Sequence, residues 1–142
     1  MIRVLVADDH HIVRQGLRHI LDREPGMCFA GEAASASEVM ARVRERNWDV
    51  LVLDIGLPDR SGMEVLKEIK EIYPEAPVVI LSMHTERQYV RQALSEGASG
   101  YVAKEGAAEE VVEAIRMAVE GEVYLSPSLA AGGEKGGGGE GG

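Results

Sequence analysis

Five short apolar runs alternate along the chain with longer stretches in which apolar residues recur every three or four positions. The runs are "VLVA" (4–7), "MCFA" (27–30), "VLVL" (50–53), "VVIL" (78–81) and "GYVA" (100–103). Continuous runs rich in Val and Ile are typical of strands buried on both faces, as in a parallel sheet. The spacing in the intervening stretches is that of amphipathic helices. The pattern therefore predicts five consecutive strand–helix units.

The helical stretches have apolar stripes and recognisable start signals. The first stripe consists of Ile12, Val13, Gly16, Leu17, Ile20 and Leu21. Ser35 and Ser37 are candidate N-caps of the second helix, and "SGME" (61–64) opens the third. Together these elements predict an α/β fold: a doubly wound, flavodoxin-like (βα)5 three-layer sandwich with parallel strand order 2-1-3-4-5. In such a sheet, ligands bind beyond the carboxyl ends of the strands, near strands 1 and 3.

Composition narrows the class of protein. The formal net charge of −9 argues against an unaided nucleic-acid binder, which usually presents a basic patch. The single cysteine, Cys28, excludes an intrachain disulfide bond. No apolar run approaches the ~18 residues of a membrane span, and the run before Asp8 is too short for a signal peptide. We therefore expect a cytoplasmic protein without membrane attachment.

The C-terminal end differs from the rest of the chain. "AAGGEKGGGGEGG" (130–142) is dominated by glycine and has almost no apolar side chain to bury. We therefore predict one domain over residues 1–126, followed by a Gly-rich flexible tail over residues 127–142.

Polar residues follow four of the five apolar runs. Asp8 and Asp9 follow the first run, Asp54 the third, Ser82 the fourth and Lys104 the fifth. An isolated acidic pair at such a position most often caps a helix. In the predicted fold, however, these ends converge at one edge of the sheet, and three crowded carboxylates repel one another unless a cation lies among them. Oxygen ligands without a Cys or His set favour Mg²⁺ over zinc.

The chemistry suggested by this group of residues is phosphoryl transfer. A lysine and Mg²⁺ beside one carboxylate neutralise the charge of a phosphoryl group, which is most of what such a transfer requires. A carboxylate can itself be the nucleophile and form an acyl phosphate. Asp54 is the best candidate because it ends the central strand, and Ser82 can donate a hydrogen bond to a phosphoryl oxygen.

These motifs resemble those of the receiver domain of bacterial two-component response regulators. The matching stretches are "DD" (8–9), "DIGLP" (54–58), "LSMH" (81–84) and "YVAKE" (101–105). The resemblance covers about residues 1–126. "DDHHIVRQGL", "GLPDRSGMEVL" and "GEVYLSP" (121–127) are most similar to the NarL/FixJ subgroup.

The resemblance implies a metal site. Asp9 corresponds to a direct Mg²⁺ ligand, and Asp8 corresponds to an acid that assists through water. Asp54 corresponds to the phosphoacceptor and contributes a further ligand. The backbone carbonyl of Gly56 corresponds to the third protein ligand.

The resemblance also implies a switch. Ser82 and Lys104 correspond to the pair that reads the phosphoryl group. Tyr101 corresponds to the aromatic residue that turns inward when the hydroxyl moves, although without the resemblance it is equally well a rim aromatic. The surface of the fourth helix, fifth strand and fifth helix is then expected to change.

Several positions depart from the family pattern or have no clear role in it. Glu105 follows Lys104 where many receivers have a proline in a cis peptide. Gly56 and His84 lie near the expected path of hydrolytic water and bear on phosphoryl lifetime. We interpret His10 and His11 as polar residues that start a helix or face a partner, because nothing supplies a third metal nitrogen.

We thus expect a signalling domain that receives a phosphoryl group on Asp54 from a histidine kinase, or from a small phosphodonor, and that assists its own phosphotransfer and dephosphorylation without being an enzyme. The family resemblance places such a domain in a transcriptional regulator, and leaves open whether phosphorylation drives homodimerisation. Regulators of the subgroup continue into a helix-turn-helix domain, whereas this chain ends in glycines, so we expect no DNA binding by this chain. The alternatives are a Mg²⁺-dependent phosphohydrolase with an aspartyl nucleophile and a receiver-fold binding module that is not phosphorylated.

Overall fold

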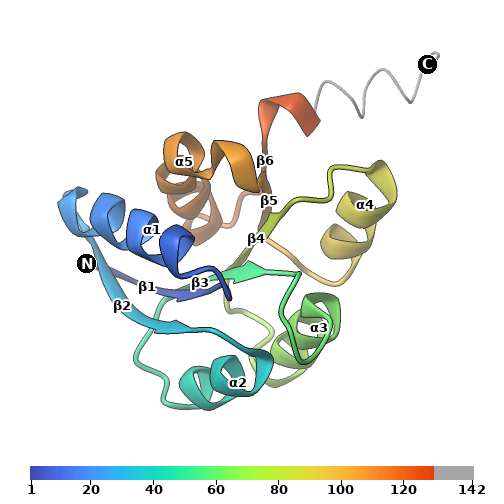
Figure 1. Ribbon diagram of the computed structural model, residues 1–142, viewed down its shortest axis with the longest axis horizontal. Helices are drawn as coiled ribbons and strands as arrows, with labels where there is room; N and C mark the ends of the chain where they lie inside the picture. Colours follow the sequence, from blue (N-terminus) through green and yellow to red (C-terminus); the bar gives the residue numbers. More distant parts are fainter. Residues whose placement is uncertain (130–142) are drawn as a thin grey trace.

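A parallel β-sheet runs through the middle of the computed structural model, with helices on both of its faces (Figure 1). The structure describes residues 1–129. The strands are β1 (Ile2–Ala7), β2 (Met27–Ala33), β3 (Val50–Asp54), β4 (Val78–Ser82), β5 (Gly100–Ala103) and β6 (Tyr124–Leu125). The helices are α1 (His11–Arg23), α2 (Ala36–Arg44), α3 (Gly62–Ile72), α4 (Arg87–Ser95) and α5 (Ala107–Val119), with a 3₁₀ turn η1 (Lys104–Gly106) before α5.

The strand order is β2-β1-β3-β4-β5-β6. The predicted flavodoxin-like sandwich and its order 2-1-3-4-5 are confirmed, and β6 is an addition at the edge. This strand has only two residues, which is too short for any periodicity to reveal it. It is held by its pairing with β5, where the Ser126 N–H donates to the Tyr101 carbonyl at 3.1 Å.

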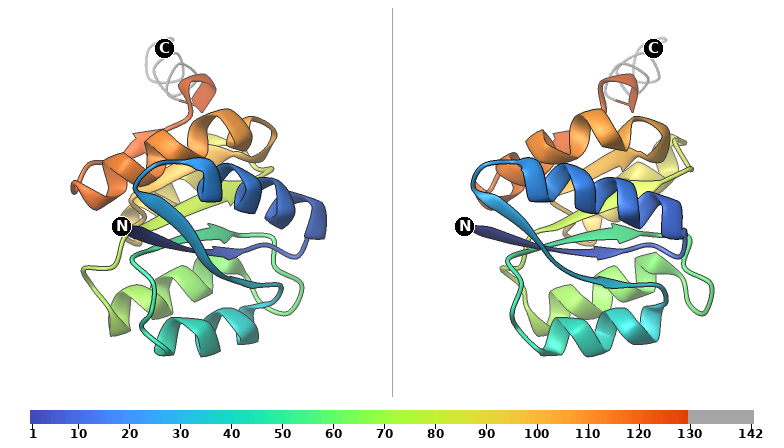
Figure 2. Two further views of the ribbon diagram at one scale, coloured as in Figure 1. Left: turned by 90° about the vertical axis from the view of Figure 1, so that its left-hand side faces the viewer. Right: turned by 60° about the vertical axis from the view of Figure 1, so that its left-hand side comes forward.

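Side chains of each strand alternate between two hydrophobic cores. In β1, Val4 and Val6 pack on one face with α1 and α5, whereas Leu5 and Ala7 pack on the other face with α2, α3 and α4. Figure 2 shows α1 and α5 on one side of the sheet and α2 and α3 on the other. Because both faces are covered, the central strands are continuously apolar.

The predicted helix starts are confirmed for α2 and α3. The Ser35 hydroxyl accepts a hydrogen bond from the Glu38 N–H at 3.2 Å, and the Ser61 hydroxyl accepts one from the Met63 N–H at 3.2 Å. The stripe predicted for the first helix is partly wrong, because Ile12 is 78% exposed. The helix buries its later turns, around Leu17 and Leu21, against the sheet.

The start of α3 lies unusually close to the chain that follows β3. A Cβ atom on Gly62 would lie 2.3 Å from the Ile55 Cα and 2.9 Å from the Asp54 carbonyl oxygen. The Gly62 N–H donates to the Ile55 carbonyl at 3.0 Å. Glycine at this position therefore lets the helix fix the backbone immediately after Asp54.

Regular structure extends a little beyond residue 126, the predicted end of the domain. Residues 127–129 are helical, and Leu129 packs against the core on the α2, α3 and α4 face. The rest of the predicted Gly-rich flexible tail, residues 130–142, lies outside the described residues. Among residues 1–129, no helix is both long and apolar enough to cross a bilayer.

Candidate phosphoacceptor site

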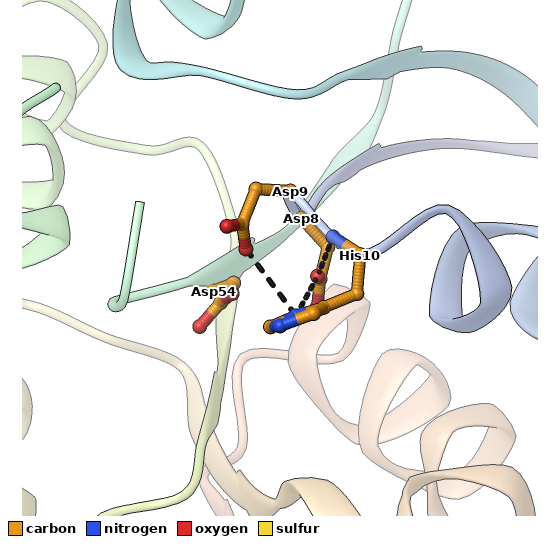
Figure 3. A group of neighbouring side chains, drawn as sticks. All are labelled: Asp8, Asp9, His10 and Asp54. Atoms are coloured by element: carbon orange, nitrogen blue, oxygen red, sulfur yellow. Dashed lines mark hydrogen bonds and ion pairs between the residues drawn. The ribbon is translucent and has the colours of Figure 1, made fainter. Parts of the chain in front are cut away.

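The polar residues that follow the strands gather at one edge of the sheet. The register pairs Asp54 with Leu81 and Ser82 with Ala103, so β3, β4 and β5 end side by side. One ligand atom each from Asp8, Asp9, His10 and Asp54 lies within 4.8 Å of all the others. Figure 3 shows the three carboxylates and the imidazole around one small space. The predicted convergence of the acids is confirmed.

Lys104 reaches into this cluster from the end of β5. Its Nζ lies 2.9 Å from Asp8 Oδ2, 3.0 Å from Asp54 Oδ2 and 2.9 Å from His10 Nδ1. The Lys104 side chain is only 7% exposed. The ammonium group is therefore held inside the site and partly offsets the charge of the acids.

Asp8 fits a bound cation. The residue is fully buried, and its Oδ2 accepts no hydrogen bond of good geometry from the described residues, although Lys104 lies at ion-pair distance. The Lys104 ammonium offsets the charge of this oxygen, but one ammonium does not balance the three carboxylates of the cluster. Asp8, Asp9 and Asp54 supply the oxygen donors that Mg²⁺ prefers, so the residues fit this ion.

Burial controls the acidity of Asp54. Desolvation raises the pKa of its carboxyl group, the charge of Asp8 raises the pKa further, and the hydrogen bond from Gly56 and the contact with Lys104 oppose the shift. For Lys104, burial alone would lower the pKa, but the contacts with Asp8 and Asp54 outweigh it and the net shift is upward. The lysine thus remains charged beside an acid whose ionised form is disfavoured by its surroundings.

The loop after β3 orients Asp54. The Gly56 N–H donates to Asp54 Oδ1 at 2.9 Å, which leaves Oδ2 facing Lys104. A Cβ atom at residue 56 would lie 3.5 Å from Asp54 Oδ1, in ordinary van der Waals contact, so residue 56 borders the carboxylate directly. The role of the Gly56 carbonyl as a metal ligand stays a prediction.

The predicted switch residues are linked through one loop. The Tyr101 hydroxyl donates to the His84 carbonyl at 2.6 Å, and the His84 N–H donates to Ser82 Oγ at 2.8 Å. Tyr101 is fully buried, so the interpretation as a rim aromatic is wrong. The His84 ring stacks on Tyr89 of α4, with ring centroids 4.6 Å apart. The loop thus joins the hydroxyl at the site to both β5 and α4.

The capping alternative for the acidic pair is not what the structure shows. The N-cap of α1 is His10, and it makes no side-chain capping hydrogen bond. Asp8 Oδ1 instead accepts from the His10 N–H at 2.7 Å, and Asp9 lies beside the imidazole. No peptide bond within residues 1–129 is cis, so the bond between Lys104 and Glu105 is trans.

Two features of the site have little or no signal in the sequence. His10 starts the helix as expected, yet its ring lies within the acidic cluster. Glu110 Oε1 accepts hydrogen bonds from the hydroxyls of Ser126, at 2.6 Å, and Tyr124, at 3.0 Å. Ser126 Oγ also accepts from the Ala103 N–H at 2.9 Å, which secures the residue before Lys104. The adjacency of His10 to the two acids is the only sequence signal for the first feature, and the second has none.

Comparison with known proteins places the chain in a family. The response regulator receiver domain matches residues 4–116. The transcriptional regulatory protein DegU of Brevibacillus brevis is 32% identical over 90% of this chain and 54% of its own length. The response regulator UvrY of Escherichia coli (strain K12) is 34% identical over 92% of this chain and 60% of its own length. The chain thus spans somewhat more than half the length of these relatives.

Solved structures of response regulators have the same fold as this chain. A two-component response regulator of the LuxR family from Aurantimonas sp. SI85-9A1 superposes with a TM-score of 0.85 at 36% identity, over 91% of this chain and 92% of that one. The response regulator domain of Thermotoga maritima CheB superposes with a TM-score of 0.78 at 32% identity, over 84% of this chain and 97% of that one. The chain is a receiver domain of the two-component response regulator family and resembles the NarL/FixJ type.

Proposed function

We propose that this receiver domain accepts a phosphoryl group on Asp54 from the phosphohistidine of a histidine kinase, with Mg²⁺ bound among the acids. The observation that carries the proposal is the contact of one buried ammonium with two buried acids: Lys104 Nζ lies within 3.0 Å of both Asp54 and Asp8. Such a site neutralises an incoming phosphoryl group and selects one nucleophile.

The transfer is a displacement at phosphorus. An Asp54 carboxylate oxygen forms a bond to phosphorus while the phosphorus–nitrogen bond of the phosphohistidine breaks, and the leaving imidazole retains the bonding pair and takes up a proton. Lys104 supports the charge on the phosphoryl oxygens. Bound Mg²⁺ would supply further charge neutralisation, with Asp9 and Asp54 as its side-chain ligands, the Gly56 carbonyl as a backbone ligand and Asp8 assisting through water.

The release of the Ser82 hydroxyl from the His84 N–H would carry the signal. A phosphoryl oxygen on Asp54 offers Ser82 Oγ a stronger partner, because hydrogen bonds to charged acceptors are about twice as strong as neutral ones. The loop at His84 is also bonded to Tyr101 and stacked on Tyr89. A shift of this loop therefore repacks α4 against β5, the surface that we expect to change.

We further propose that the domain acts as a cytoplasmic phosphoacceptor and not as an enzyme with a separate substrate, within a regulator of transcription. The curated relatives DegU and UvrY are named as a transcriptional regulatory protein and a response regulator. Whether phosphorylation produces a homodimer is decided by measuring mass in solution with and without the phosphodonor.

The test is the intact mass after incubation with acetyl phosphate and Mg²⁺, with Asp54→Asn as the matched control. We expect one phosphoryl adduct of ~80 Da in the wild type, none in the control and none without Mg²⁺. Continuous release of phosphate without an adduct would favour the phosphohydrolase. Neither an adduct nor released phosphate, with acetyl phosphate or a kinase, would favour the binding module.

A further inference from the structure

Ser126 joins the chain after β6 to the strand that carries Lys104. The residue is fully buried, and its Oγ accepts a hydrogen bond from the Ala103 N–H at 2.9 Å. The same hydroxyl donates to Glu110 Oε1 at 2.6 Å. The Ser126 N–H donates to the Tyr101 carbonyl at 3.1 Å. Ser126 thus bonds β5 at two points, and the second point directly precedes Lys104.

The free edge of β5 needs this partner because β6 is too short to supply one. β6 pairs only with Gly100 and Tyr101, so the ladder on this edge stops before Ala103 (Figure 1). On the opposite edge, the pairing with β4 continues to Ser82, which lies opposite Ala103. Since a buried backbone N–H without an acceptor is costly, the Ser126 hydroxyl takes the place of the missing strand.

Glu110 fixes the direction of the Ser126 hydroxyl. A serine hydroxyl has one proton, and the Glu110 carboxylate accepts it, so the oxygen is free to accept from the Ala103 N–H. The Tyr124 hydroxyl donates to the same Glu110 oxygen at 3.0 Å. The other carboxylate oxygen lies against η1, because a Cβ atom on Gly106 would lie 2.6 Å from Glu110 Oε2.

The backbone position of Lys104 decides where its ammonium lies. Its Nζ reaches Asp8 Oδ2 at 2.9 Å and Asp54 Oδ2 at 3.0 Å from the end of a strand of four residues. A displacement of about 1 Å in a reacting or stabilising group can slow a reaction about 100-fold. The hydrogen bond from the preceding N–H to Ser126 therefore bears on the placement of the charge beside Asp54.

We propose that Ser126 is a positioning residue for the Lys104 ammonium, and that Glu110 orients the Ser126 hydroxyl for this role. Neither residue contacts Asp54 or Lys104 Nζ directly. The inference rests on the proposed function, because its effect is a change in the rate of phosphoryl transfer to Asp54. It also gives a role to the motif "GEVYLSP" (121–127), which otherwise has no part in the site.

The chain offers two matched pairs of variants. Ser126→Ala and Tyr124→Phe each remove one hydroxyl that donates to Glu110, but only Ser126 also bonds the Ala103 N–H. Glu110→Gln keeps a side-chain oxygen that accepts from Ser126, whereas Glu110→Ala removes it. Glu110 is only partly buried, so the second pair disturbs the core less than Ser126→Ala does.

The experiment measures the rate constant of phosphorylation by radiolabelled acetyl phosphate at saturating Mg²⁺, together with urea unfolding of each variant. We expect the rate constant to fall about tenfold or more in Ser126→Ala and by less in Glu110→Ala. Tyr124→Phe and Glu110→Gln should react at close to the wild-type rate. Lost stability alone would lower the fraction of chain that is folded and labelled, while the folded fraction would keep the wild-type rate constant.

A second measurement places the effect at the lysine. In a Lys104→Ala background, Ser126→Ala should change the rate constant little, because the group that Ser126 positions is absent. Two residues that act through one group are not additive, whereas independent effects on the fold add.

The outcomes separate this inference from the proposed function. A wild-type chain that forms no adduct contradicts the proposed function. An adduct that forms equally fast in the wild type and in Ser126→Ala overturns the positioning role alone. Equal slowing in Ser126→Ala and Tyr124→Phe, or an undiminished effect of Ser126→Ala in the Lys104→Ala background, overturns it as well. If Ser126→Ala does not fold, equal rate constants for Glu110→Ala and Glu110→Gln overturn it instead.

Discussion

Two helical glycines give opposite predictions for the same substitution. Gly62 begins α3 directly against the chain that follows Asp54, whereas a methyl group added to Gly16 of α1 would meet nothing within 4 Å beyond the backbone of its own helix. Glycine-to-alanine changes within helices normally stabilise by about 0.5–1 kcal/mol. Gly16→Ala should show this gain, while Gly62→Ala should show a loss.

The magnitude for Gly62→Ala follows from its contacts. The added methyl group would lie 2.3 Å from the Ile55 Cα, so backbone atoms must separate by more than about 1 Å before ordinary contact is restored. Overpacking of this kind costs about 1–3 kcal/mol or more. With a urea slope of about 2 kcal/mol/M, a loss of about 2 kcal/mol lowers the midpoint by about 1 M.

The assay is urea unfolding of both variants beside the wild type. Because the shifted backbone carries Asp54, Gly62→Ala should also slow phosphorylation by acetyl phosphate, and Gly16→Ala should not. A Gly62→Ala variant as stable as Gly16→Ala would show that the close approach of α3 to Ile55 does not constrain the fold.

The remaining predictions concern buried polar groups. Burial and the hydrogen bond to Glu110 raise the pKa of Tyr124 to about 12. The contribution of Tyr124 to the free energy of unfolding is therefore complete below pH 10 and is lost as pH rises toward 12. In urea unfolding, Tyr124→Phe should lose less stability than the wild type over this pH range. Ser126→Ala leaves the buried Ala103 N–H and Glu110 without this partner and should cost about 1–3 kcal/mol in the same assay. The pKa of Asp54 is raised, chiefly by burial, so the contribution of Asp54 to stability is present below pH 3.8 and declines as pH rises. At neutral pH in the presence of a chelator, Asp54→Asn should therefore have a higher melting temperature than the wild type. Addition of Mg²⁺ should narrow this difference in melting temperature.

The sheet and the acidic site were predictable because each rests on a strong local signal. The central strands are apolar on both faces, and each ends at a polar residue, so the topology alone brings Asp8, Asp54 and Lys104 together. The caps at Ser35 and Ser61 follow from side chains that bond within three residues. Interactions between residues this close in the chain can be predicted from short stretches of sequence.

The rest depends on three-dimensional context. Ile12 has the helical spacing of a core residue but is exposed, whereas the adjacent Val13 packs against the core. β6 exists only through its pairing with β5 and the hydrogen bonds of Ser126. The direction of the His10 ring is set by the turn after β1 and by Lys104, which is 94 residues away in the chain. No periodicity or motif encodes such contacts.

The most direct test of Asp54 as the phosphoacceptor is to locate the phosphoryl group. Borohydride reduces an aspartyl phosphate to homoserine, so reduction after treatment with acetyl phosphate and Mg²⁺, followed by peptide mass analysis, identifies the modified residue. We expect homoserine at residue 54, where the carboxylate contacts Lys104 at 3.0 Å. Asp54 would not be the phosphoacceptor if homoserine were found at Asp8 or Asp9. The same would follow if a chain that carries the phosphoryl adduct were reduced at no residue.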